Sequence, residues 1–391
     1  MRDPMLDKLA HIVVHHCAPV RTGDLVTIVA EPGCTAGIEA MFEAVLKAGA
    51  HPSFHPRSES LQQILLAHGS DQQLRHVCPF EEFRLARCDV LIVLRSSHNT
   101  RFLGGIDSSK VAQMQASRKG LMAMSMQRAA AGTMRYVLTE IPSLGAAQDA
   151  EMSLAQYADH VYRAGLLHLT DPLQAWRTLH AQQERVRLFL QNKQVLRFRA
   201  PASDGTHGAF RHDGTDLTVD ISGRTWVNCA GGQNFPDGEV FSGPRSVDGV
   251  LNVTHPSVYK GAEVDGVRLE FKAGRVVEAS ATRNEEYLIR LLDQDPGARI
   301  AGEIAIGTNY ELREFLRNAF FDEKIGGTFH IALGAGYPET GNTNQSGLHW
   351  DFVSDLRPGT AFPGSPGGTI EADGEVFHRN GRFLVADWPG N

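Results

Sequence analysis

The first half of the chain alternates short apolar runs with segments of helical periodicity. Leu25–Ala30 (LVTIVA) and Val90–Leu94 (VLIVL) are apolar runs rich in β-branched residues, and His51–His55 is a third candidate strand. Strands that are apolar on both faces are typical of a parallel sheet covered by helices. The apolar spacing also predicts helices, one that stops at Gly49 and three over Lys110–Met126, Leu154–Ala164 and Leu173–Gln191.

After about residue 195 the pattern becomes rich in strands. Asp373-Gly374 and Asn380-Gly381 lie between β-rich runs, which is the strongest local signal of a hairpin, and Pro358–Gly368 is an expected loop. The sequence therefore predicts an N-terminal α/β domain with a largely parallel sheet over residues 1–194. A β-rich α+β catalytic domain is expected over residues 195–391. Its expected elements include strands at Val195–Arg199, Asp216–Ile221, Arg224–Cys229, Val267–Phe271 and Arg275–Ala279, and a helix at Asn284–Leu292.

Composition and charge exclude several classes of partner. The 391 residues carry a formal charge of −7, which argues against nucleic acid as the main partner. No run of about 18 apolar residues is present, so no membrane-spanning segment is expected. Asp3 and Asp7 lie where a signal peptide would be apolar, and the five scattered cysteines form no C-x-x-C pair. A cytoplasmic protein with reduced thiols is the simplest interpretation.

The common nucleophile and nucleotide motifs are missing. The chain contains no G-x-S-x-G elbow, no phosphate-binding G-x-x-x-x-G-K-[ST] loop and no H-E-x-x-H zinc helix. Gly334-Ala335-Gly336 begins like a dinucleotide-binding loop, but Glu339 occupies the position of the third glycine. The chemistry must therefore be sought in another group of residues.

Possible ligands for a hard metal ion gather between residues 234 and 351. His349-Trp350-Asp351 is an H-x-D sequence, and residues two apart on a strand face the same side. His330 lies in a strand-like run, Thr328–Leu333. Glu303 and Glu239 lie in short apolar runs beside glycine, where a buried carboxylate needs a cation or several hydrogen-bond donors.

Each of these residues alone is more often structural than functional. A lone histidine in an apolar strand is usually a satisfied core residue, and a lone glutamate beside glycine is mostly a cap or a surface charge. Two histidines and three carboxylates in one segment leave a metal site and a structural role both open. With N and O donors and no thiolate, the ion would be Zn, Mn, Co or Fe(II).

The wording of this segment closely resembles a known family. Phe321–Leu333 reads FDEKIGGTFHIAL and Gly334–Asp351 reads GAGYPETGNTNQSGLHWD. Upstream are Asn234–Phe241 (NFPDGEVF) and Gly302–Asn309 (GEIAIGTN). These blocks resemble the M29 metallopeptidases, the aminopeptidase T family. The resemblance covers the second half in order, and the first half more loosely through Leu138–Met152.

The resemblance implies a hydrolase, a dinuclear metallo-aminopeptidase that releases N-terminal residues from peptides with a free N-terminus. It implies two divalent ions (Zn, Co or Mn), with Glu303 a plausible bridge between them, and a homodimer. Tyr337, seven residues after His330, matches the tyrosine of the family's site and is the expected catalytic residue. The metal ligands that the resemblance implies are Glu239, Glu303, His330, His349 and Asp351.

Four positions depart from the family's expected wording: Ser242 replaces threonine, Asn342 replaces a second glycine after Gly341, and Arg317-Asn318 precede the D-E-K block in unfamiliar form. None of them is an expected ligand. Asp322 and Lys324 of the D-E-K block fit either an outer support for the ligands or a structural ion pair, and neither is placed in the predicted site.

Two other functions compete with the aminopeptidase. Ring-cleaving dihydroxypyridine dioxygenases resemble distant relatives of this fold and use one Fe(II) held by histidines and an H-x-D sequence. That alternative keeps His349 and Asp351 but requires a further histidine in place of Glu239, so the carboxylate at 239 favours the hydrolase. The other alternative is a non-catalytic binding protein that has kept the fold.

Overall fold

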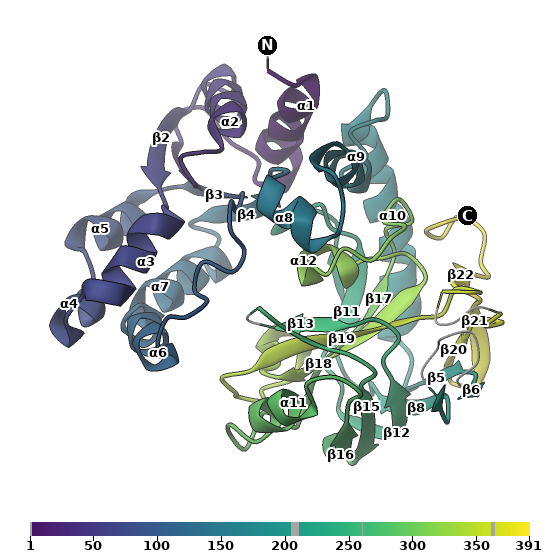
Figure 1. Cartoon of the computed structure of the whole chain (residues 1–391). Helices are drawn as coiled ribbons and strands as arrows, with labels where there is room; N and C mark the ends of the chain where they lie inside the picture. The colour runs from purple at the N-terminus through teal and green to yellow at the C-terminus, as the bar shows by residue number, and fades with distance from the viewer. Residues whose placement is uncertain (1, 205–210, 260, 361–363) are drawn as a thin grey trace. The chain divides into compact units, whose positions relative to one another are not determined.

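The computed structural model describes residues 2–204, 211–259, 261–360 and 364–391 (Figure 1). The chain separates into two compact units, which are Met1–Leu173 with Gly231–Pro236, and Gln174–Ala230 with Asp237–Asn391. Helix α10 (Pro172–Gln191) begins at this division. The expected division into one domain at residues 1–194 and a second at residues 195–391 stays a prediction.

The first unit is built on a parallel sheet with the strand order β10-β4-β3-β1-β2. Every pairing in it is parallel, and Val26, Thr27 and Ile28 of the interior strand β1 are buried, which covers both faces of that strand. This burial explains why β1 is nearly all apolar, whereas the edge strand β2 is largely exposed and partly polar. The predicted fold class is confirmed. The strands are β1 (Leu25–Ala30), β2 (His51–Pro56), β3 (Val90–Arg95), β4 (Arg135–Glu140) and β10 (Asn234–Phe235).

Several helices of this unit begin at polar caps. Asp3 accepts a hydrogen bond from the backbone of Met5 at the start of α1, and Ser153 and Gln156 form a capping box on α9. The single helix expected over Lys110–Met126 is instead two helices, divided at Arg118. The helices are α1 (Pro4–Ile12), followed by the π-helix η1 (Val13–Cys17), α2 (Thr35–Lys47), α3 (Glu59–His68), α4 (Asp71–Arg75), α5 (Pro79–Arg87), α6 (Ser108–Ser117), α7 (Lys119–Ala130), α8 (Leu144–Asp149) and α9 (Leu154–Ala164).

The second unit contains two larger antiparallel sheets, whose strands run in different directions in Figure 1. The five-stranded sheet has the order β19-β18-β17-β11-β9. Its strands are β9 (Val227–Cys229), β11 (Glu239–Ser242), β17 (Ala301–Gly307), β18 (Thr328–Gly334) and β19 (His349–Asp355). Strand β9 is shorter than the expected Arg224–Cys229, because the backbone of Arg224 bonds to Ile221 in a turn.

The eight-stranded sheet has the order β16-β15-β12-β8-β5-β20-β21-β22. Asp373, Gly374, Asn380 and Gly381 all have positive φ, as two-residue hairpin turns require, so both predicted hairpins are confirmed. Its strands are β5 (Val195–Ala200), β8 (Thr215–Asp220), β12 (Ser246–Asn252), β15 (Arg268–Lys272), β16 (Arg275–Ser280), β20 (Thr369–Ala372), β21 (Glu375–Arg379) and β22 (Arg382–Phe383). Smaller elements are β6 (Ser203–Asp204), β7 (Arg211–His212), β13 (Ser257–Tyr259), β14 (Ala262–Val264), α11 (Glu285–Leu292), α12 (Ala319–Asp322) and the 3-10 turn η3 (Pro338–Thr340).

One hydrophobic core joins the two large sheets of this unit. Ile304, Ile331 and Phe352 of the five-stranded sheet belong to the same buried cluster as Leu217 and Leu269 of the eight-stranded sheet. Each fully buried side chain of this size contributes about 1.5–3 kcal/mol relative to an exposed one. Because strand residues alternate between faces, this core fixes which residues of the five-stranded sheet face the other way.

No helix among the described residues is both long enough and apolar enough to cross a bilayer.

Candidate metal centre

The five expected ligands lie on one face of the five-stranded sheet. Their side chains alternate with Val240, Ile304, Ile331 and Trp350, which all point into the hydrophobic core. The apolar residues next to each polar residue are therefore the ones whose side chains face the core. Strand β11 carries Glu239, β17 carries Glu303, β18 carries His330, and β19 carries His349 and Asp351.

Small residues separate the expected ligands on this face. Ala332 lies opposite both Glu303 and Asp351 in the strand register, and Ala305 lies opposite His330. Both alanines are fully buried. The side chain at each of these two positions is only a methyl group, so it leaves room for the longer ligand side chains to converge above it.

The converging atoms form two groups that share one glutamate. Glu239, Glu303 and His330 form the first group, and Glu303, His349 and Asp351 form the second, with the donor atoms of each group within 4.8 Å of one another. Nε2 of His330 is 3.7 Å from Oε1 of Glu303, while Nε2 of His349 is 3.3 Å from Oε2 of the same side chain. Glu303 thus directs one oxygen toward each histidine.

Both histidines are oriented by backbone carbonyl groups. Nδ1 of His330 is 3.1 Å from the carbonyl oxygen of Glu323, and Nδ1 of His349 is 2.9 Å from that of Ala335. A carbonyl oxygen only accepts hydrogen bonds, so each Nδ1 is the donor and each Nε2 faces the carboxylates. This is the arrangement that orients histidine ligands in metalloproteins.

The pKa values of His330, His349 and Glu303 are strongly shifted by the charges of the neighbouring site residues. Burial alone would lower the pKa of His330, but Glu303, Glu239 and Asp351 raise it to about 10. Burial likewise opposes the charged form of His349, whose pKa is raised to about 10 by Asp351 and Glu303. Burial would raise the pKa of Glu303, yet hydrogen bonds from the two imidazoles lower it to about 2. In the absence of a metal ion, protons provide the positive charge that Glu303 needs.

The other two carboxylates are less well compensated. Burial raises the pKa of Glu239 to about 8 despite the nearby charge of Lys324, and Oε2 of Glu239 is buried without a hydrogen bond among the described residues. Burial and the charge of Glu323 raise the pKa of Asp351 to about 6. Buried carboxylates of this kind are stabilised by a cation. Histidine nitrogen and carboxylate oxygen suit Zn, Mn and Co, so the residues present fit divalent ions.

The first and last residues of the D-E-K block, Asp322 and Lys324, are both buried. Lys324 is fully buried and forms an ion pair with Glu323, and its ammonium lies 3.7 Å from Oε1 of Glu239. Asp322 accepts hydrogen bonds from the backbone of Leu316 and Asn318. Sequence reasoning left both residues outside the site. The only signal in the sequence that points to Lys324 is its place six residues before His330, in the same D-E-K-I-G-G-T-F-H block.

Tyr337 lies beside the same face. Its ring is 5.1 Å from that of Phe241 and 5.3 Å from that of His349, both edge to face. Burial, followed by the negative charges of Glu303 and Asp351, raises the pKa of its hydroxyl. The phenol therefore stays protonated and can act as a hydrogen-bond donor.

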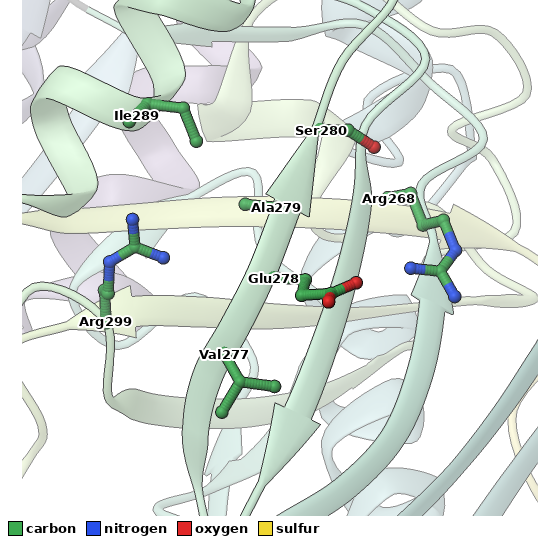
Figure 2. A pocket seen from close by; sticks show the side chains of 7 residues that line it. All are labelled: Arg268, Val277, Glu278, Ala279, Ser280, Ile289 and Arg299. Carbon is green, nitrogen blue, oxygen red and sulfur yellow. The ribbon is translucent and has the colours of Figure 1, made fainter.

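A separate open pocket lies elsewhere on the second unit. It has a volume of about 360 Å³ between β15, β16 and α11, and Figure 2 shows the side chains that line it. Arg268 is paired with Asp213, and Arg299 with Asp293, so both guanidinium groups already have partners. The pocket contains neither of the two donor groups and is not the metal centre.

A largely buried set of histidines and carboxylates on one face of a β-sheet is typical of metal-dependent enzymes. The sequence profile of the thermophilic metalloprotease (M29) family matches residues 2–383. The chain therefore belongs to the M29 family of metallopeptidases.

Individual proteins agree with this assignment. Aminopeptidase 2 of Geobacillus stearothermophilus is 26% identical over 427 residues, covering 97% of each chain. The solved structure of AmpT from Thermus thermophilus has the same fold, with a TM-score of 0.80 at 22% identity, covering 98% of this chain and 99% of that one. A 2,5-dihydroxypyridine dioxygenase from Pseudomonas putida KT2440 has a similar fold, with a TM-score of 0.59 at 14% identity and 98% coverage of both chains.

Proposed function

We propose that this protein is a metal-dependent aminopeptidase whose site holds two divalent ions, Zn, Co or Mn. Glu239, Glu303 and His330 would bind one ion, and Glu303, His349 and Asp351 the other. The observation that carries the proposal is the pair of donor groups joined by Glu303, which offers one oxygen to each group. A carboxylate shared in this way suits two ions about 3.5–4 Å apart.

The charge around the site supports two ions rather than one. Three carboxylates are proposed ligands: Glu239, Glu303 and Asp351. Two further carboxylates, Glu323 and Asp237, lie close enough for their negative charges to act on the buried ammonium of Lys324. Five carboxylates and one ammonium leave a net formal charge of −4, which two divalent cations would neutralise. A single divalent ion would leave two negative charges uncompensated in a buried region.

The protein's own residues would divide the work of peptide hydrolysis. Bound divalent ions supply an acidified water and a Lewis acid for the scissile carbonyl. Tyr337 would donate its hydroxyl to the oxyanion that develops on that carbonyl, a contribution of about 10²–10³ in rate for a single donor. The site would also hold the free α-amino group of a peptide as a further nitrogen donor, which would restrict cleavage to the first residue.

The dioxygenase alternative is not favoured, although a protein of that activity shares the fold. It requires a histidine where Glu239 stands, and a single iron would use only one of the two donor groups. Glu239 instead lies within 4.8 Å of donor atoms from His330 and Glu303, as a second ion would require.

The proposal also includes a cytoplasmic homodimer that acts on peptides with a free amino terminus. The cysteines of the described residues form no disulfide, which supports a reducing compartment, and the activity named for the aminopeptidase relatives supports peptide substrates. Light scattering on the purified protein tests the dimer, because a mass equal to one chain would contradict it.

The decisive experiment is hydrolysis of leucine p-nitroanilide by protein that has been stripped with a chelator and resupplied with Co, Zn or Mn. We expect metal-dependent release that is lost in Glu303→Gln and kept in the exposed control Glu375→Gln. Failure of every metal to restore release, across several aminoacyl anilides, would reject the aminopeptidase. Oxygen consumption with Fe(II) and dihydroxylated aromatic rings then tests the dioxygenase, and inactivity in both assays points to a binding protein.

A further inference from the structure

Asn342 is a buried polar residue in the loop that carries Tyr337. Its amide nitrogen donates to the carbonyl oxygens of Pro244 at 3.1 Å and Ala301 at 3.0 Å. Its amide oxygen accepts from the backbone of Asn344 at 3.0 Å, and the residue is 6% exposed. Both amide hydrogens are therefore used, each by a different segment of the chain.

These two acceptors belong to strands of the metal-site sheet. Pro244 follows the end of β11, the strand of Glu239, and Ala301 begins β17 two residues before Glu303. One side chain thus links the Tyr337 loop to the two strands whose glutamates are the proposed ligands.

The surroundings of Asn342 are shaped for this side chain. A Cβ atom at Gly243 would collide with Cβ of Asn342, and one at Gly336 would collide with its amide oxygen. Neither glycine has positive φ, so space rather than backbone conformation requires glycine there. The loop closes locally as well, since Thr340 donates its hydroxyl to the carbonyl of Tyr337 at 2.6 Å.

We propose that Asn342 is a positioning residue that holds the Tyr337 loop in a fixed place relative to Glu303. It does not reach the reacting atoms itself, and it acts through the hydroxyl of Tyr337. This inference rests on the proposed function, in which that hydroxyl stabilises the oxyanion. A glycine at 342, as the family wording led us to expect, would leave the loop without these three hydrogen bonds.

The kinetic test is a double-mutant cycle with Asn342→Ala and Tyr337→Phe on aminoacyl anilides. We expect Asn342→Ala to lower kcat about 10- to 100-fold, as for a misplaced catalytic group, with KM within about twofold. Added to Tyr337→Phe, the same change should lower kcat by less than about twofold, because the hydroxyl that it positions is already absent. An equal loss in both backgrounds, or no loss in either, would overturn the proposal.

A matched control separates positioning from stability. Asn252 is also buried, 5% exposed, and its amide nitrogen donates to Asp213 and Gly214 away from the metal-site face. Asn252→Ala removes a comparable pair of hydrogen bonds, and we expect it to leave kcat unchanged. If Asn342→Ala does not fold, Asn342→Gly and the isosteric Asn342→Asp replace it in the cycle with the same expected outcome.

A measurement that needs no activity distinguishes failure of this inference from failure of the proposed function. Tyrosines are replaced with 3-fluorotyrosine, and the ¹⁹F resonance of Tyr337 is assigned from the spectrum of Tyr337→Phe. We expect a single narrow Tyr337 resonance in the native sequence and a broadened or split one in Asn342→Ala. An unchanged resonance would overturn the positioning role even if the protein hydrolyses no anilide.

Discussion

The ammonium nitrogen of Lys324 lies 3.7 Å from Oε1 of Glu239, in a place where Lys324 is fully buried and the Glu239 side chain is 9% exposed. Burial lowers the pKa of a lysine, but the charges of Glu239, Glu323 and Asp237 outweigh it and raise the pKa of Lys324. The metal-site face therefore contains one permanent internal cation, whether or not metal ions are bound.

The first prediction concerns this buried ion pair. Lys324→Met leaves the buried Glu239 and the partly exposed Glu323 without their cation, so we expect the metal-free protein to lose about 3–5 kcal/mol of its free energy of unfolding. Urea denaturation measures this loss. The matched control is Lys193→Met, which removes a partner from Glu375, an acceptor that is 67% exposed. The control should lose only about 0–1 kcal/mol, and equal losses in the two variants would contradict the prediction.

The second prediction is that metal binding releases protons. In the metal-free protein the pKa values of His330 and His349 are both raised to about 10 by the nearby carboxylates, and burial raises that of Glu239 to about 8. At pH 7 all three groups hold protons that metal ions must displace. We expect release of about three protons for a fully loaded site, and an affinity that rises with pH up to about pH 10.

Calorimetry with zinc in HEPES and in Tris measures these protons, because the two buffers differ in their heat of ionisation. His349→Gln should release about one proton fewer. An affinity that does not change between pH 6 and pH 9 would show that these groups are not displaced by the metal.

The third prediction tests the small residues beneath the metal site. Ala332→Leu places a larger side chain between Glu303 and Asp351, and we expect at least tenfold weaker zinc binding, together with about 1–3 kcal/mol of destabilisation from overpacking. Ala372→Leu overpacks an equally buried alanine in the eight-stranded sheet and should leave zinc binding unchanged. Equal weakening in both variants would mean that general destabilisation, and not the site, is responsible.

The fourth prediction concerns the stability of the protein in acid. His378 is fully buried with neither ring nitrogen hydrogen-bonded among the described residues, and burial lowers its pKa to about 3. An ordinary histidine in the unfolded chain has a pKa of 6.5, so the unfolded state binds an extra proton between about pH 6.5 and pH 3. Its contribution to stability is complete above pH 6.5 and is lost as the pH falls below that value.

At pH 5.5 this loss is about 1.4 kcal/mol relative to pH 8. His378→Phe removes the titrating group. From pH 8 to pH 5.5, the free energy of unfolding of this variant should therefore fall by about 1.4 kcal/mol less than that of the native sequence. Denaturant titrations at pH 8, where the imidazole is neutral in both states, provide the reference for each protein. The same acid loss in both proteins would show that His378 does not contribute.

Local pattern was sufficient for most elements and for the candidate ligands. The apolar runs at β1 and β3, the alternation through β17 and β18, and the two hairpin turns at Asp373 and Asn380 each depend on residues a few positions apart. The same alternation singled out His330 and Glu303 as polar residues within otherwise apolar strands. The family wording, also a property of sequence, identified the M29 family that the profile match confirms.

Only the tertiary structure decided how distant segments meet. The chain returns at Gly231–Pro236 to add β10 beside β4, although almost a hundred residues separate the two strands. The break at Arg118 between two helices has no clear local signal, because the apolar spacing continues on both sides of it.

The site depends on the same kind of long-range contact. The register of β17, β18 and β19 brings Glu303, Ala332 and Asp351 into one row, and it is fixed by hydrogen bonds between strands. Burial of Lys324 and the links from Asn342 to Pro244 and Ala301 likewise arise only when these strands pack. Sequence by itself determined which residues are apolar, which are polar and how they alternate. Strand pairing decided which polar residues share a face, because hydrogen bonds and packing between distant segments leave no periodic signal along the chain.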